Sequence, residues 1–201
     1  MTQTAHAISL SGSVATVTEY LGFAINNILY QRGVYPPEDF QQVKKYGLAL
    51  MISTDSELNA YLSELLQQIA RWISNGACRR IVLLITDVAT ESTLERWEIS
   101  IEMEPSTAAG TSQQRPKKSE EDVRREIQVV MRQITACVSF LPVISVPCAF
   151  DLLVYTSTDA QAPSTAWEPS APQLIRGGTA VRLRSFTTAM HHVDTNIVYR
   201  A

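Results

Sequence analysis

The residues best suited to metal or acid–base chemistry lie near the C-terminus, where His191 and His192 are followed by Asp194. Imidazole and carboxylate groups bind metal ions, and an imidazole also carries protons near neutral pH. Adjacent residues of a strand point to opposite faces, however, and no third ligand is close in the sequence. We therefore expect the two histidines to be exposed, and the sequence predicts no metal site.

Other signatures of catalysis are missing from the sequence, which contains no GxSxG, P-loop, GxGxxG, HExxH or CxxC pattern. The chain has three cysteines, Cys78, Cys137 and Cys148, an odd number without CxxC spacing. This pattern favours free thiols in a reducing compartment. The sequence therefore predicts an intracellular protein that is not an enzyme and has no cofactor. A hydrolase with a dispersed active site stays open as a different class.

Composition favours one globular domain and disfavours two classes of partner. The chain has 201 residues, of which 45% are hydrophobic and 18% charged, and its net charge is −3. Such a charge gives no basic field for nucleic acid. The N-terminus lacks a signal-peptide pattern, and no apolar stretch reaches the roughly 18 residues of a membrane span. We expect neither nucleic acid nor membrane to be a direct partner.

Apolar residues at steps of three and four predict three helices. The first covers about 13–32 and ends at Gly33. The second follows a capping box formed by Thr54 and Glu57, and Gly76 is placed to end it. The third begins at Ser119, which acidic residues follow, and is predicted to continue for about 33 Å to Pro142 as the central helix of the fold.

The strands are predicted from apolar runs. Residues 81–85 are typical of a buried strand. Within residues 97–103 the apolar side chains alternate with Glu and Ser, as in a strand with one face exposed to solvent. Strands are also predicted over 143–146 and 150–155, separated by Pro147. The second of these is apolar on both faces and therefore needs cover on both.

Two segments are predicted to be loose. The polar residues of 105–118 cannot offset the entropy of ordering, so this segment is expected to form a mobile loop. Proline and glycine interrupt the chain from Ser157 onward until two strand-like runs at 181–190 and 196–199. Within this tail the large aromatic side chain of Trp167 must either anchor the tail to the rest of the domain or cover a bound partner. Anchoring is favoured.

Six runs of residues carry a resemblance that covers essentially the whole chain. They are INNILYQRGVYPPEDF (25–40), KKYGL (44–48), LERWEISIE (94–102), RQITACVSFLP (132–142), FDLLVYT (150–156) and VRLRSFTT (181–188). In this order and spacing they resemble the spindle-checkpoint family of HORMA-domain proteins. The resemblance implies an α/β (α+β) fold in which three main helices pack on a mainly antiparallel sheet. It implies one domain over 1–201, with a core of about 10–157 and a mobile C-terminal safety belt of about 158–201.

The resemblance also implies a function, that of a non-enzymatic adaptor with open and closed states. In the open state the belt occupies the edge strand at 150–155; in the closed state it moves across the sheet and traps an extended peptide at that strand. The implied partners are a coiled-coil kinetochore scaffold and the activator of the anaphase-promoting complex, whose sequestration delays anaphase. A second copy of the chain, a HORMA-like silencing adaptor and an AAA+ remodelling ATPase are further implied partners, in nucleus, kinetochore and cytoplasm.

Site residues carry over from the resemblance at matching positions. Those expected to bind the peptide are Trp72, Phe150, Leu152, Val154, Tyr155 and Trp167. Those expected at a dimer interface are Arg132, Gln133, Phe140 and Arg184. Two alternatives within the same fold are a component of the meiotic chromosome axis and a subunit of a translesion polymerase. The compact tail argues against the first, and the run RQITACVSFLP argues against the second.

Overall fold

The computed structural model describes residues 8–104, 118–161, 163 and 167–200. The helices are α1 (Leu10–Gln31), α2 (Ser56–Ser74) and α3 (Glu120–Ala136), with short 3₁₀ helices η1 (Pro37–Asp39) and η2 (Cys137–Ser139). The strands are β1 (Phe40–Lys45), β2 (Leu48–Ser53), β3 (Cys78–Asp87), β4 (Thr93–Met103), β5 (Cys148–Thr156), β6 (Thr179–Arg182), β7 (Phe186–Thr187) and β8 (His191–Tyr199). The predicted α+β class is confirmed.

The strands form one main sheet and one separate hairpin. The main sheet has six strands, which follow the order β5-β3-β4-β8-β6 with β7 also paired to β8, and every pairing is antiparallel. Within the described ranges, strands β1 and β2 pair with each other and with no other strand. The C-terminal strand β8 therefore lies inside the sheet, while β5 lies at an edge.

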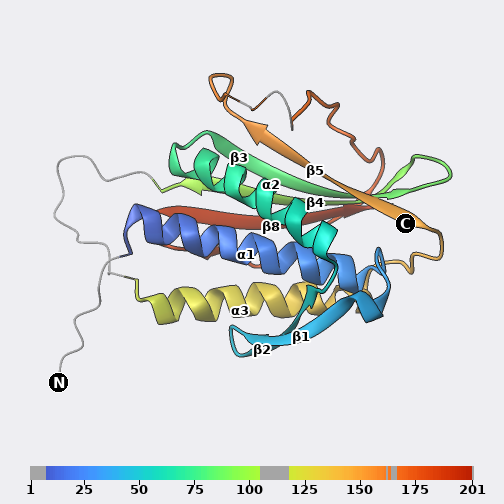
Figure 1. Ribbon diagram of the computed structural model, residues 1–201, viewed down its shortest axis with the longest axis horizontal. Helices are drawn as coiled ribbons and strands as arrows, with labels where there is room; N and C mark the ends of the chain where they lie inside the picture. The colour runs from blue at the N-terminus through green and yellow to red at the C-terminus, as the bar shows by residue number, and fades with distance from the viewer. Residues whose placement is uncertain (1–7, 105–117, 162, 164–166, 201) are drawn as a thin grey trace.

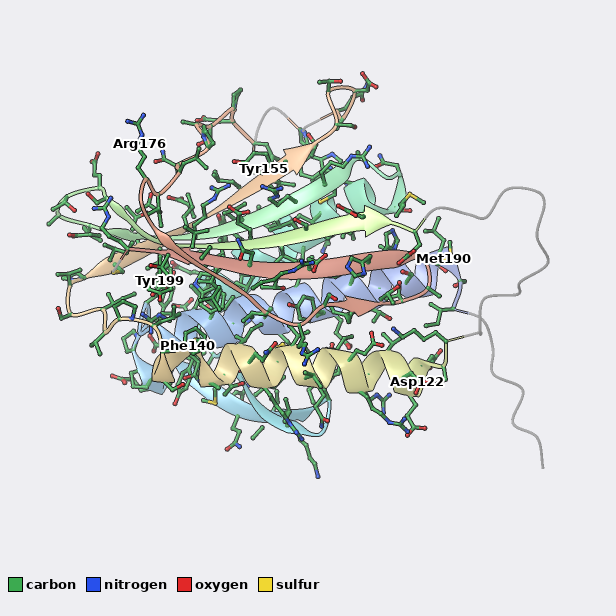
Figure 2. The ribbon with its side chains drawn as sticks, turned by 180° about the vertical axis from the view of Figure 1, so that it is seen from behind. Asp122, Phe140, Tyr155, Arg176, Met190 and Tyr199 are labelled. Carbon is green, nitrogen blue, oxygen red and sulfur yellow. The ribbon has the colours of Figure 1, made fainter. Side chains whose placement is uncertain are left out.

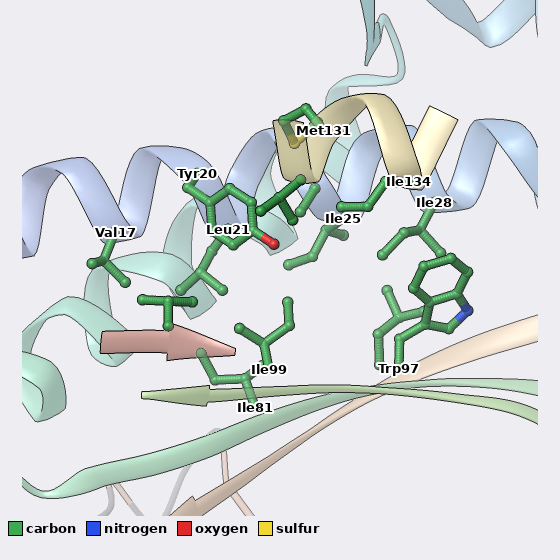
Figure 3. Close-up of a cluster of buried hydrophobic side chains, with 14 of the residues drawn as sticks. Val17, Tyr20, Leu21, Ile25, Ile28, Ile81, Trp97, Ile99, Met131 and Ile134 are labelled. Carbon is green, nitrogen blue, oxygen red and sulfur yellow. The ribbon is translucent and has the colours of Figure 1, made fainter. Parts of the chain in front are cut away.

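The helices cover one face of the main sheet, and α1 lies between α2 and α3 (Figure 1). Helix α1, and not the third helix as predicted, is thus the central one. Its buried side chains meet those of α3 and of the sheet in one core, where Tyr20 and Ile25 lie above Ile81 and Ile99 (Figure 3).

The predicted start of α2 is wrong by one residue. Asp55 is the N-cap, and its carboxylate accepts hydrogen bonds from the backbone N–H groups of Glu57 and Leu58 at 2.8 and 2.9 Å. Aspartate satisfies these free donors and also places negative charge at the positive end of the helix. Gly76 follows the helix with a φ of +71°, as the prediction requires.

The third helix is shorter than predicted. It ends at Ala136 and so spans about 26 Å, after which the backbone tightens into η2. The N–H groups of Phe140 and Leu141 both donate to the carbonyl of Cys137, at 3.1 and 2.9 Å. Proline disfavours the helical conformation in the residue before it, so Leu141 could not have carried the helix on to Pro142.

Two strand predictions need correction. Residues 143–146 form no strand, and Pro147 precedes β5 instead of dividing two strands. The β1–β2 hairpin was not predicted. The predicted loop at 105–118 falls, apart from Lys118, outside the described residues.

A buried ion pair connects three parts of the fold. Arg32, at the end of α1, donates from Nε to Glu95 Oε1 on β4 at 2.8 Å, and Trp97 Nε1 donates to Glu95 Oε2 at 2.9 Å. Arg32 also donates to the carbonyl of Pro142. The side chains of Arg32 and Glu95 are only 4% and 3% exposed. This cluster fixes the end of α1 and the chain after α3 against the sheet.

Candidate functional site

Strand β5 offers an open edge. It pairs with β3 on one side, and within the described residues no strand pairs with its other side. Leu152 and Val154 stand opposite Leu83 and Ile81, whose side chains belong to the core under the helices. Such an edge presents free N–H and C=O groups to any extended chain that lies along it.

The chain after β5 turns back along this edge (Figure 1). We call the described residues between 158 and 178, which are 158–161, 163 and 167–178, the covering segment. Its residues 167–172 enclose a cavity of about 500 Å³ together with Trp72 and residues 152–156. A second cavity of about 530 Å³ continues along β5 and is lined by residues that include Tyr61 and Asp151. We call these two cavities together the β5 channel.

Two contacts hold the covering segment to α2. The rings of Trp72 and Trp167 meet edge to face with their centroids 4.8 Å apart. The indole Nε1 of Trp72 donates to the carbonyl of Gln161 at 3.1 Å. The anchoring role predicted for Trp167 is consistent with this geometry, and the same two rings form a wall of the channel.

Five of the six residues expected to bind a peptide line one cavity: Trp72, Leu152, Val154, Tyr155 and Trp167. The sixth, Phe150, lies nearer the start of β5. Its ring meets those of Tyr35 and Tyr61 edge to face, with centroids 6.1 Å apart in each case. The structure therefore gathers the apolar side chains of β5 along one open edge.

Sequence reasoning missed Arg96 on β4. The alternation around Trp97 predicts that the opposite face of the strand, on which Arg96 lies, is exposed to solvent. Arg96 is nevertheless only 2% exposed. Its guanidinium donates to the carbonyl of Pro172 in the covering segment and to the Tyr155 hydroxyl. No local pattern could reveal this burial, because the cover comes from a segment about eighty residues later.

The expected exposure of the two histidines is wrong, because His191 is buried and His192 is half-buried. His191 is 1% exposed, and its Nδ1 lies 2.6 Å from the Ser13 hydroxyl of α1. Burial lowers the pKa of His191, which favours the neutral ring. His192 points to the other face of β8 and contacts Asp194 at 2.8 Å. In the part of the chain that the structure describes, no three or more His, Cys, Asp or Glu side chains are grouped so that they could hold a metal ion.

The residues expected at a dimer interface lie along α3 and beside β7. The amide oxygen of Gln133 accepts a hydrogen bond from the backbone N–H of Arg184 at 2.7 Å, so the structure brings these two together. Arg132 is exposed on the same helix. Phe140 is 42% exposed beyond η2, at the end of α3 away from Asp122 (Figure 2).

The HORMA domain profile matches residues 13–191. The chain belongs to the HORMA-domain family. The human mitotic spindle assembly checkpoint protein MAD2A is 45% identical over 193 residues, which cover 96% of this chain and 93% of that protein. A chain in the crystal structure of the mitotic checkpoint complex superposes with a TM-score of 0.85 and 38% identity, over 94% of this chain and 99% of that one.

Within the HORMA-domain family these matches identify the checkpoint branch. Caenorhabditis elegans HTP-2 bound to the HIM-3 closure motif has a TM-score of 0.80 over 96% of this chain and 92% of that one, but only 14% identity, so it shows the fold alone. This HORMA-domain protein is a spindle assembly checkpoint protein of the MAD2 type and a non-enzymatic adaptor, as the resemblance implies. Among the described residues, no helix is long and apolar enough to cross a membrane.

Proposed function

We propose that this checkpoint protein traps an extended peptide in the β5 channel. The peptide adds to β5 as a further strand, and the covering segment closes over it. Main-chain hydrogen bonds to an open edge supply affinity, and pockets for alternate side chains supply specificity. The observation that carries the proposal is the cavity between β5 and residues 167–172, which Trp72 and Tyr155 line.

The position of the tail supports a closed state. Its strands β6, β7 and β8 lie at the side of the sheet away from β5, where β8 pairs with β4. In the open state implied by the family resemblance, the tail would occupy the β5 edge instead. The proposal thus divides the domain into a core of about 10–157 and a belt of about 158–201 that has two positions on one sheet.

The proposed peptides come from the coiled-coil kinetochore scaffold and from the activator of the anaphase-promoting complex. Capture of the activator keeps it from the ubiquitin ligase and delays anaphase. A HORMA-like silencing adaptor and an AAA+ ATPase would reverse the closed state. With these partners the protein would act in the nucleus, at kinetochores and in the cytoplasm. Fluorescence anisotropy with overlapping synthetic peptides from the scaffold and the activator tests the proposal, which fails if none binds.

Trp167→Ala should accelerate release of such a peptide by roughly twofold to tenfold. The edge-to-face pair with Trp72 would be lost, and such pairs are worth about 0.5–1.5 kcal/mol. Stopped-flow displacement of a labelled scaffold peptide measures the rate. The control Trp167→Phe keeps an aromatic ring at the position and should release peptide at nearly the parent rate. Equal release from the alanine variant and the parent would contradict the role of Trp167.

The proposed dimer joins two copies in different states through Arg132, Gln133, Phe140 and Arg184. Support comes from the exposure of Arg132 and Phe140 and from the contact between Gln133 and Arg184, which aligns the chain before β7 with α3. Exposed aromatic rings and arginines are both enriched among the residues that dominate binding at protein interfaces.

Arg132→Glu should abolish this dimer on gel filtration. The change reverses the charge of an exposed side chain, so the free energy of unfolding should change by no more than about 0.5 kcal/mol, and peptide binding should persist. Arg79→Glu is a matched control, because Arg79 is exposed on β3, away from α3. Loss of dimer in both variants, or loss of peptide binding along with the dimer, would remove Arg132 from the interface.

A further inference from the structure

Arg96 is a buried cation on the sheet face that the helices do not cover. Trp97 and Ile99 point to the helices, so the alternate residues Arg96 and Glu98 point away from them. Arg96 is 2% exposed even though it lies on this outer face. A buried guanidinium is stable only where its donors and its charge are satisfied, so its partners show what this face is built to hold.

The partners of Arg96 come from three different parts of the chain. Its Nε donates to the carboxylate of Glu98, which balances the charge. Its Nη1 donates to the carbonyl of Pro172 in the covering segment. Its Nη2 donates to the Tyr155 hydroxyl on β5 at 3.1 Å, and the guanidinium carbon lies 5.8 Å from the centre of that ring. One side chain therefore joins the covering segment, the edge strand and β4.

These contacts define how the covering segment passes β5. Trp72 belongs to the core on the helix side of the sheet and binds the carbonyl of Gln161 there. Arg96 binds Pro172 on the opposite side. Because Trp167 meets Trp72 on the helix side, the covering segment is fastened on both faces of the sheet. Its residues 167–172 pass around the edge of β5, with the channel beneath them.

We infer that Arg96 is the clasp that fastens the covering segment on the outer face of the sheet and thereby limits the rate at which a bound peptide leaves. The inference rests on the proposed peptide capture. Arg96 is a positioning residue, because it reaches the channel only through Pro172 and Tyr155. Arginine suits this role because its planar fork donates in several fixed directions at once, which the single ammonium of lysine cannot reproduce.

The test compares Arg96→Lys with Arg80→Lys. Arg80 is the matched control, since it lies 5.8 Å from the same Tyr155 ring and forms an ion pair with the same Glu98 at 3.3 Å, but its side chain is 44% exposed. Arg96→Lys should raise the dissociation rate of a labelled scaffold peptide at least about tenfold, the effect of losing one charged hydrogen bond. Arg80→Lys should leave that rate unchanged.

Hydrogen exchange of the peptide-free protein provides a second readout. Mass spectrometry should show faster exchange over residues 167–178 in Arg96→Lys and unchanged exchange in α1. If no peptide binds even to the parent, the proposed function fails, while exchange still tests the clasp. Unchanged exchange over 167–178 together with an unchanged dissociation rate would overturn the inference.

A further variant covers the case in which Arg96→Lys does not fold. Tyr155→Phe removes one acceptor of Arg96 and leaves the buried charge paired with Glu98. It should also accelerate exchange over residues 167–178, though less than the lysine variant. Exchange at the parent rate in Tyr155→Phe would then overturn the inference.

Discussion

Replacement of Glu95 by alanine should lower the free energy of unfolding by about 3–5 kcal/mol. The change leaves the buried guanidinium of Arg32 without its counter-charge and the Trp97 indole N–H without its acceptor. Water cannot compensate, because the Arg32 side chain is only 4% exposed. Urea denaturation followed by circular dichroism measures the loss.

Two controls separate this effect from a general loss of side-chain packing. Glu121→Ala breaks an exposed pair with Arg125, whose side chains are 71% and 66% exposed, and should cost less than about 1 kcal/mol. The double variant Arg32→Met, Glu95→Leu removes both charges and should recover most of the stability that Glu95→Ala loses. A double variant no more stable than Glu95→Ala would contradict the explanation by an unpaired buried charge.

Deletion of residues 192–201 should weaken peptide binding at least about tenfold, equivalent to 1.4 kcal/mol. The deletion removes nearly all of β8, which pairs with both β4 and β6, so the covering segment loses its attachment to the far side of the sheet. Surface-binding measurements should show the loss chiefly as faster dissociation, because closure over the peptide sets its release.

The same deletion should leave a folded but less stable protein. Val193 and Ile197, which are buried in the core, would be lost, and burial of each such side chain contributes about 1.5–3 kcal/mol. The helices and strands β3, β4 and β5 precede the deletion, so unfolding should stay cooperative at a lower temperature. Unchanged affinity and unchanged dissociation in the truncated protein would show that the C-terminal strand does not hold the channel closed.

The elements predicted well from the sequence are those with strong local patterns. The apolar spacing of α1 and α2 and the compact run of β3 follow directly from burial on one face or both. Strand β5 was predicted at 150–155 with apolar residues on both faces, and the structure places one face against the core and the other under the covering segment. The local pattern was sufficient to predict β5, because the burial of both faces directly requires apolar residues on both.

The elements that could not be predicted depend on distant parts of the chain. The β1–β2 hairpin carries the polar run FQQVKK and is held by Asn26 and Asn27, whose side-chain oxygens accept from the backbone of Ser53 and Met51 at 2.8 and 3.0 Å. His191 is buried because Ser13, far away in the sequence, supplies its partner. Such pairings are tertiary, and no short window of sequence contains them.

In the candidate site, too, the features set by local sequence were predicted and those set by tertiary contacts were not. The apolar residues of β5 were expected at the site, and all but Phe150 line the channel. The fastening of the cover by Trp72 and Arg96 was not expected, because both act on backbone carbonyls of Gln161 and Pro172. Every residue has a backbone carbonyl, so the sequence does not indicate which carbonyl will accept such a hydrogen bond.

The path of the covering segment has a mechanical consequence. Residues 167–172 pass around the edge of β5, and the chain after them rejoins the sheet through β6 and β8 (Figure 1), so a peptide captured as we propose would be threaded through a loop. A short free peptide can slide out lengthwise, whereas a cargo with folded domains on both flanks is too bulky to slide. Under the proposed capture, tension on such a cargo would load the C-terminal strands, and their local unfolding would set the time for which the cargo is held.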